Sequence, residues 1–140
     1  MTPLFLLSLL SLLSITKSTT LTVPLPLRGW NSWNAHQCNI SSSLIRSTAS
    51  SISSNPSLLN IYKYVIVDDC WLSGSRDPST SRQVPDPERF PEGMKALGSY
   101  LHSLSLRLGI YTSVGRTTCE GLPASYGHYD IDARAYVEWG

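Results

Sequence analysis

The sequence has little charge, few cysteines and no long apolar run, and each shortage excludes a class of function. Only 15% of its 140 residues are charged, and the formal net charge is +1. A chain with this balance offers no polyelectrolyte surface for phosphate backbones or anionic lipid. We therefore expect a globular protein without a nucleic-acid partner.

One apolar run lies at the N-terminus. Residues 4–15 read LFLLSLLSLLSI, which is the length of a signal-peptide core and shorter than a membrane span. The small residues Thr16 and Ser18 suit a cleavage site. We predict a signal peptide over residues 1–18 and a mature segment over 19–140 without a membrane anchor. The destination is then extracellular, lysosomal or vacuolar. A buried N-terminal helix is the alternative.

The chain has only three cysteines, Cys38, Cys70 and Cys119. Exported chains form disulfides, and an odd number of cysteines cannot all pair within one molecule. Their separations are too long for the Cys-x-x-Cys clusters of a structural zinc site. We expect one internal bridge, one cysteine whose partner lies beyond Gly140, and no metal or other cofactor.

Strand-like and helix-like segments alternate along the chain. The segment at 62–69 contains a short β-branched run, which is typical of a strand buried on both faces. The alternation predicts parallel strands with right-handed crossovers. An eight-stranded TIM (β/α) barrel needs about 250 residues. We therefore predict an α/β fold that forms the opening three βα units of such a barrel, incomplete in this chain, with a small doubly wound sheet as the alternative. The expected strands are 28–33, 62–69 and 106–112, and the expected helices are 41–54, from 91 and from about 130.

Residues near the helix ends suggest where each helix begins or stops. The Asn-Pro-Ser at 55–57 predicts the end of the first helix, and Pro91 predicts the start of the second. Asp130 and Asp132 suit the positive end of the third helix. Together with His128 they alternate like metal ligands, but the helix dipole explains them more simply.

Four residues at the predicted carboxyl ends of the strands could form a site, because ligands of parallel β/α folds bind there. They are Trp33, Asp68, Asp69 and Tyr111. Carboxylates can accept hydrogen bonds from sugar hydroxyls, and aromatic rings can cover the apolar face of a pyranose. Adjacent strand residues point to opposite faces, so the two aspartates need a turn to reach one ligand. A solvated strand end or a helix cap is the alternative.

Several motifs follow one another along the chain. They are GWNSWN at 29–34, YKYVIVDDCW at 62–71, Arg76-Asp77, PDPERFPEGMKAL at 85–97, LRLGIYTSVG at 106–115, Thr118-Cys119 and DIDARAYVEWG at 130–140. Any one of them alone would be modest evidence, whereas their order and spacing together are strong evidence. With these motifs the chain resembles the retaining α-galactosidases, a family that includes the α-N-acetylgalactosaminidases, and the resemblance covers nearly all of the chain after residue 18.

The resemblance implies a TIM barrel that hydrolyses terminal α-linked galactose with retention, acts on an oligosaccharide or glycoconjugate, and forms a homodimer as one option when full length. It implies a Cys38–Cys70 disulfide and a Cys119 partner outside the chain. The family nucleophile and acid/base aspartates have no counterpart in these 140 residues, so we expect this chain alone to be inactive. The family's sugar contacts correspond to Trp33, Asp68, Asp69, Tyr111 and Cys119.

A few positions depart from the family pattern. Arg28 replaces a usual methionine, Ser113 a usual aspartate, and Ser105 a glycine that ordinarily ends a helix. We expect Ser105 to adopt a conformation that glycine adopts at less cost. Separately, Asn39 opens an Asn-Ile-Ser glycosylation sequon, for which an unmodified polar loop is the alternative.

Three hypotheses about function remain. The first is an N-terminal segment of an α-galactosidase, and the second is a segment of an α-N-acetylgalactosaminidase. The third is a secreted non-catalytic product or galactose-binding remnant. The first two differ in the wall around the sugar C2 substituent. We favour the first.

Overall fold

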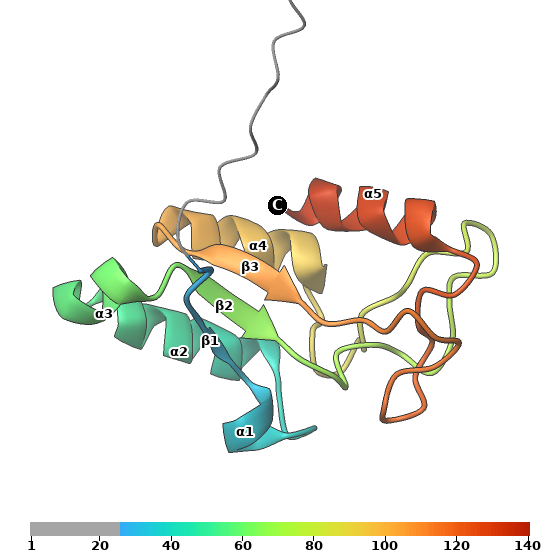
Figure 1. Cartoon of the computed structure of the whole chain (residues 1–140), viewed down its shortest axis with the longest axis horizontal. Helices are drawn as coiled ribbons and strands as arrows, with labels where there is room; N and C mark the ends of the chain where they lie inside the picture. Colours follow the sequence, from blue (N-terminus) through green and yellow to red (C-terminus); the bar gives the residue numbers. More distant parts are fainter. Residues whose placement is uncertain (1–25) are drawn as a thin grey trace, which may run out of the picture.

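Three short parallel strands form a single sheet in the computed structural model, which describes residues 26–140 (Figure 1). The strands are β1 (Gly29–Asn31), β2 (Tyr64–Val67) and β3 (Arg107–Ile110), in the spatial order β1-β2-β3. Both neighbouring pairs are parallel. The predicted strands and their parallel order are therefore confirmed. The predicted signal peptide at 1–18 lies outside the described residues.

Four of the helices, α2 to α5, pack against one another on one face of the sheet, whereas α1 follows the carboxyl end of β1. In Figure 1 the longer helices run alongside the strands, with α2 next to β2 and α4 next to β3. In turn, α3 packs against α2, and α5 packs against α4. The three predicted helices correspond to α2, α4 and α5. The helices are α1 (Trp33–His36), α2 (Ser42–Ser53), α3 (Pro56–Ile61), α4 (Gly93–Ser103) and α5 (Tyr129–Trp139).

Two helix boundaries differ from the sequence prediction. The Asn-Pro-Ser at 55–57 does end α2, but it also starts α3, because the Asn55 Oδ1 accepts hydrogen bonds from the backbone N–H groups of Ser57 and Leu58 at 3.0 and 3.3 Å. Asn55 is thus an N-cap with a proline in the first turn behind it. Pro91 lies in a turn before α4 rather than inside that helix, which begins at Gly93.

The core lies between the sheet and the helices. Val65 and Val67 of β2 are fully buried, whereas Tyr64 and Ile66, which point to the opposite face, are only half-buried. This alternation follows the two-residue period of a strand. One face of the sheet is therefore covered by helices, and the other is open within residues 26–140. The fully buried helix residues that complete the core include Ile45, Ala49, Leu97, Leu101 and Ala135.

The left-handed conformation expected at Ser105 is present, with φ of 62°. Ser113 keeps a supporting role in its loop, because its hydroxyl accepts a hydrogen bond from the Gly115 N–H at 3.1 Å. Nothing in the structure explains the arginine at position 28. Over residues 26–140, no helix has both the length and the apolar character that spanning a membrane would need.

Candidate functional site

The carboxyl ends of the three strands lie side by side and continue their hydrogen bonding beyond the sheet. The Tyr111 N–H donates to the Val67 carbonyl oxygen at 3.0 Å, and the Ser32 N–H donates to the Ile66 carbonyl oxygen at 3.1 Å. The Asp68 N–H donates to the Ser32 hydroxyl at 3.0 Å. The register therefore brings the predicted residues Asp68 and Tyr111 to the same edge of the sheet.

The Asp68 carboxylate is held by the neighbouring strand. The Asn31 side-chain amide donates to Asp68 Oδ2 at 2.6 Å, and the Asn31 Oδ1 accepts the Trp33 backbone N–H at 2.8 Å. Asp68 itself is half-buried. Asn31 thus ties the start of α1 to the first of the two carboxylates, and Asp68 retains accessible acceptor capacity because each carboxylate oxygen has two lone-pair sites.

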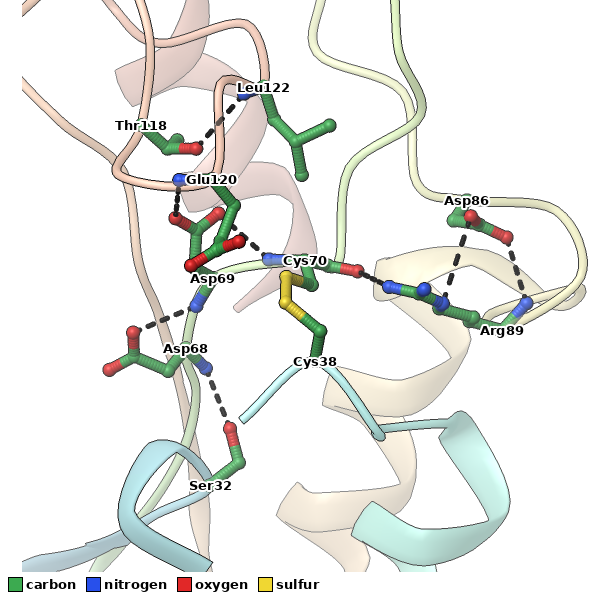
Figure 2. Close-up of a disulfide and its surroundings, with 10 residues drawn as sticks. All are labelled: Ser32, Cys38, Asp68, Asp69, Cys70, Asp86, Arg89, Thr118, Glu120 and Leu122. Carbon is green, nitrogen blue, oxygen red and sulfur yellow. Dashed lines mark hydrogen bonds and ion pairs between the residues drawn. A yellow bond between two sulfur atoms is a disulfide. The ribbon is translucent and has the colours of Figure 1, made fainter. Parts of the chain in front are cut away.

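The Asp69 carboxylate is almost completely buried, with 1% of its surface exposed. Its Oδ1 accepts the Cys70 N–H at 2.8 Å, and its Oδ2 accepts the Glu120 N–H at 3.1 Å (Figure 2). The turn that the sequence required is present, because Cys70 has a φ of 73°. Asp69 stays a predicted sugar contact, and the structure gives it a second role as the anchor of the loop around Glu120.

The Cys38–Cys70 disulfide implied by the resemblance is present in the structure, with a Cα–Cα distance of 5.2 Å (Figure 2). It ties the segment after α1 to the turn after β2. The Arg89 guanidinium also donates to the Cys70 carbonyl oxygen at 2.7 Å. Cys119 is a free, exposed thiol within the described residues. The turn that carries Asp69 is therefore held by three separate segments of the chain, through the Cys38 disulfide, the Arg89 guanidinium and the Glu120 N–H.

Tyr111 lies close to Cys119 and Asp69. Its hydroxyl is 3.5 Å from the Cys119 Sγ, and the Trp71 indole N–H fixes its backbone by donating to its carbonyl oxygen at 2.8 Å. The hydrogen bond with Cys119, followed by burial and the negative charges of Cys119 and Asp69, raises the pKa of Tyr111 to about 12. The phenol is therefore protonated at neutral pH and can donate to a ligand.

The remaining predicted residues are placed less centrally. Trp33 is half-buried and packs against the core, and only its backbone is linked to Asp68, through Asn31. Asn39 is exposed next to the disulfide. Sulfur atoms of Cys38 and Cys70 lie within 4.8 Å of a Glu120 carboxylate oxygen. Because the two sulfur atoms are bonded to each other, they cannot act as the thiolate ligands that a metal would need.

A buried ion pair holds the loops around the site. The Arg76 guanidinium binds both carboxylate oxygens of Asp132 at 2.7 Å and donates to the Ala124 carbonyl oxygen at 2.7 Å and to the Ser81 carbonyl oxygen at 2.8 Å. Asp132 is 1% exposed. The prediction that the helix dipole accounts for Asp132 was therefore incomplete, because the charge of this α5 residue is also matched by Arg76 from the loop after β2.

Sequence reasoning missed the residues that position the site. Asn31 and Ser32 lie within the quoted motif at 29–34, but their partners are 37 and 36 residues away in the sequence. Glu120 contributes a backbone N–H, which no residue type can signal. Only the order of strands offered a clue, because parallel neighbours bring the ends of β1 and β2 together.

The fold and the position of the candidate site define the class of protein to which the chain belongs. The chain is a β/α protein whose polar and aromatic groups gather at the carboxyl ends of parallel strands, where such proteins bind their ligands. A melibiase family model, described as alpha galactosidase A, matches residues 25–140. The chain belongs to this family.

Curated relatives agree with this assignment. A protein of Neosartorya fischeri named "Probable alpha-galactosidase B" is 49% identical over 118 residues, which cover 83% of this chain and 26% of the relative. A protein of Emericella nidulans with the same name is 46% identical over 116 residues, covering 82% of this chain and 26% of the relative. The chain therefore spans about a quarter of the length of these relatives.

Solved structures show the same fold. Alpha-galactosidase I from Mortierella vinacea is 43% identical with a TM-score of 0.79, over 82% of this chain and 29% of that one. An α-galactosidase from Saccharomyces cerevisiae, solved with raffinose, is 39% identical with a TM-score of 0.77, over 81% of this chain and 25% of that one. The described residues form three βα units of the TIM barrel of these enzymes, as predicted, and not a small doubly wound sheet.

Proposed function

We propose that this chain is the galactose-recognition side of a secreted α-galactosidase that hydrolyses terminal α-linked galactose with retention of configuration. The observation that carries the proposal is the cluster of Asp68, Asp69 and Tyr111 at one strand edge of a melibiase-family chain. The relatives and structures at 43–49% identity are all named as α-galactosidases, which favours galactose over N-acetylgalactosamine.

The chemistry of these groups suits a sugar. Asp68 can accept hydrogen bonds from hydroxyl groups, Tyr111 can donate one, and the Trp33 indole can cover the C–H face of the ring. We assign the aspartates to holding the sugar rather than to bond cleavage. Retaining glycosidases place two carboxyl groups on either side of the scissile bond, roughly 5 Å apart, and sequence neighbours that share one turn cannot flank the bond in this way.

The substrate class follows from the same proposal. A relative from Saccharomyces cerevisiae was solved with raffinose, an oligosaccharide that ends in an α-linked galactose. We propose a terminal α-galactoside as substrate, reached outside the cell or in a lysosome or vacuole after export through residues 1–18. We also propose that the complete protein forms a homodimer.

A chimera tests the proposal. Residues 26–140 would replace the aligned segment of Mortierella vinacea α-galactosidase I, giving what we call the Mortierella chimera. Because this segment supplies one side of the sugar site, we expect the chimera to release galactose from raffinose. Asp68→Asn should reduce that release at least tenfold, since it replaces an ionised acceptor with a weaker neutral one.

The control is Glu88→Gln, which changes an exposed acid in the loop before α4. It should leave raffinose hydrolysis unchanged. A folded chimera without activity, or an Asp68→Asn variant as active as its parent, would contradict the proposal. A second, smaller chimera that exchanges only residues 62–71 guards against loss of folding in the larger graft.

A further inference from the structure

Asn39 is a candidate site for covalent modification. It opens Asn39-Ile40-Ser41, which is the only Asn-x-Ser/Thr sequence in the 140 residues with a non-proline middle residue, because Asn55 is followed by proline. We propose that Asn39 carries an N-linked glycan. The inference rests on the proposed export of the chain, and its test separates the two.

The local geometry suits a glycan. Asn39 is exposed, whereas its neighbour Ile40 is only 4% exposed and anchors the segment in the core. On the other side, Cys38 is fixed by its disulfide to Cys70. The Asn39 backbone N–H is bonded to the His36 carbonyl oxygen at 2.8 Å. The backbone is therefore held on both sides, and a glycan on the exposed amide displaces none of the core.

The folded segment also fixes when the glycan must be attached. Ser41, the hydroxyl residue of the sequon, is the N-cap of α2, and its Oγ accepts the Leu44 N–H at 3.3 Å and lies 2.9 Å from the Ser43 hydroxyl. With this hydroxyl engaged and Ile40 buried, the folded sequon is a poor acceptor. Transfer must therefore precede docking of α2 and closure of the disulfide.

The glycan would lie at the same end of the strands as the candidate site. The Cα atoms of Cys38 and Cys70 are 5.2 Å apart, and consecutive Cα atoms are about 3.8 Å apart, so the Cα atoms of Asn39 and Asp69 are within about 13 Å of each other. The modified residue therefore belongs to the surroundings of the site rather than to the opposite end of the sheet.

The test is expression of the full chain, residues 1–140, in a eukaryotic secretory host. Peptide mass mapping with and without treatment by an N-glycosidase should show one glycan, at Asn39. Because transfer precedes folding, the readout does not require a folded product. A parallel version places an established signal peptide before residue 26. Unmodified Asn39 in that exported version overturns the inference. A glycan in that version alone supports the inference and overturns the proposed export through residues 1–18.

Matched variants sharpen the result. Asn39→Gln and Ser41→Ala should abolish the glycan, because each destroys the sequon. Ser41→Thr should retain it, because threonine preserves both the sequon and the helix cap. Asn55→Gln should change nothing, since proline follows that asparagine. A glycan that survives Asn39→Gln would also overturn the assignment.

Discussion

At the residue scale, Asp69 anchors a loop and also lies among the residues that we propose to bind the sugar. Its two oxygens accept backbone N–H groups from Cys70 and Glu120 while it sits at the strand edge with Asp68 and near Tyr111. A buried carboxylate in this position is satisfied only by donors. Losing the charge should therefore affect stability as well as ligand binding.

We predict that Asp69→Asn lowers the free energy of unfolding of the Mortierella chimera by about 1–3 kcal/mol. An amide has one acceptor oxygen, so one of the two backbone N–H groups loses its partner. Urea denaturation followed by fluorescence measures the change. Glu88→Gln, on the surface, should stay within about 0.5 kcal/mol of the parent. If the Asp69→Asn variant were as stable as the parent, Asp69 would not be the anchor of the loop around Glu120.

Ser105 provides a second test at this scale. Its φ of 62° lies in the left-handed region, which costs a non-glycine residue roughly 1 kcal/mol. Ser105→Gly should therefore stabilise the chimera by about that amount. Ser103→Gly, inside the last turn of α4, should instead destabilise it by roughly 0.5 kcal/mol, because glycine is a poorer helix former than serine. Thermal unfolding measures the melting temperatures of both variants. If the two substitutions shifted the melting temperature in the same direction, the assignment of strain to Ser105 would be wrong.

At the scale of elements, the sequence predicted best where burial repeats regularly. The α2 and α4 helices have apolar residues at the period of a helix, β2 is a short run rich in β-branched residues, and all three were predicted. The short helices α1 and α3 have four and six residues, too few for a periodic pattern. The helix α3 depends on a single cap, Asn55, whose sequence neighbourhood also fits a simple helix end.

Some features of the candidate site could likewise be predicted from the sequence, and others could not. The position of Asp68, Asp69 and Tyr111 at one edge of the sheet could be predicted, because strand order alone places the residues that follow parallel strands there. Their contact with a sugar stays a prediction. Asn31 and Arg89 could not, because they act through hydrogen bonds to distant segments that only the folded chain brings near. Such partners have no signal in composition or spacing.

The Arg76–Asp132 pair gives the prediction that belongs to this scale. It joins the loop after β2 to α5, and both side chains are largely buried, at 13% and 2% exposure. Removing one partner leaves an uncompensated buried charge, so Arg76→Met should destabilise the chimera by about 3–5 kcal/mol. The free energy of unfolding in urea measures this effect.

The matched control is the Arg82–Glu138 pair, which also links that loop to α5 but is more exposed, at 34% and 56%. Arg82→Met should cost no more than about 1 kcal/mol, because solvent screens exposed pairs. If Arg76→Met and Arg82→Met lowered the free energy of unfolding equally, burial of the Arg76–Asp132 pair would not explain its contribution to stability.

At the scale of the whole molecule, the described residues form an arc rather than a closed unit. Within residues 26–140, β1 and β3 are each paired along one side only, and the face of the sheet that carries Ile66 is uncovered by helices. Unpaired strand edges are templates for association with other chains. The disulfide and the Arg76–Asp132 pair stabilise the arc but do not cover its edges.

We therefore predict that a polypeptide of residues 19–140 self-associates when produced alone. Size-exclusion chromatography with light scattering should show species larger than a monomer, and heating should show no cooperative transition. The Mortierella chimera, in which the edges have partners, should be soluble under the same conditions. A monomeric, cooperatively melting product from residues 19–140 would contradict the prediction.

We propose that Asp68, Asp69 and Tyr111 bind one galactose together. A crystal structure of the Mortierella chimera with galactose is the sharpest test of this arrangement. We expect a single galactose whose hydroxyl groups lie within about 3.2 Å of oxygens of both aspartates, with the Trp33 ring against its C–H face. A galactose bound elsewhere, or one in the barrel mouth that touches neither aspartate, would refute the arrangement.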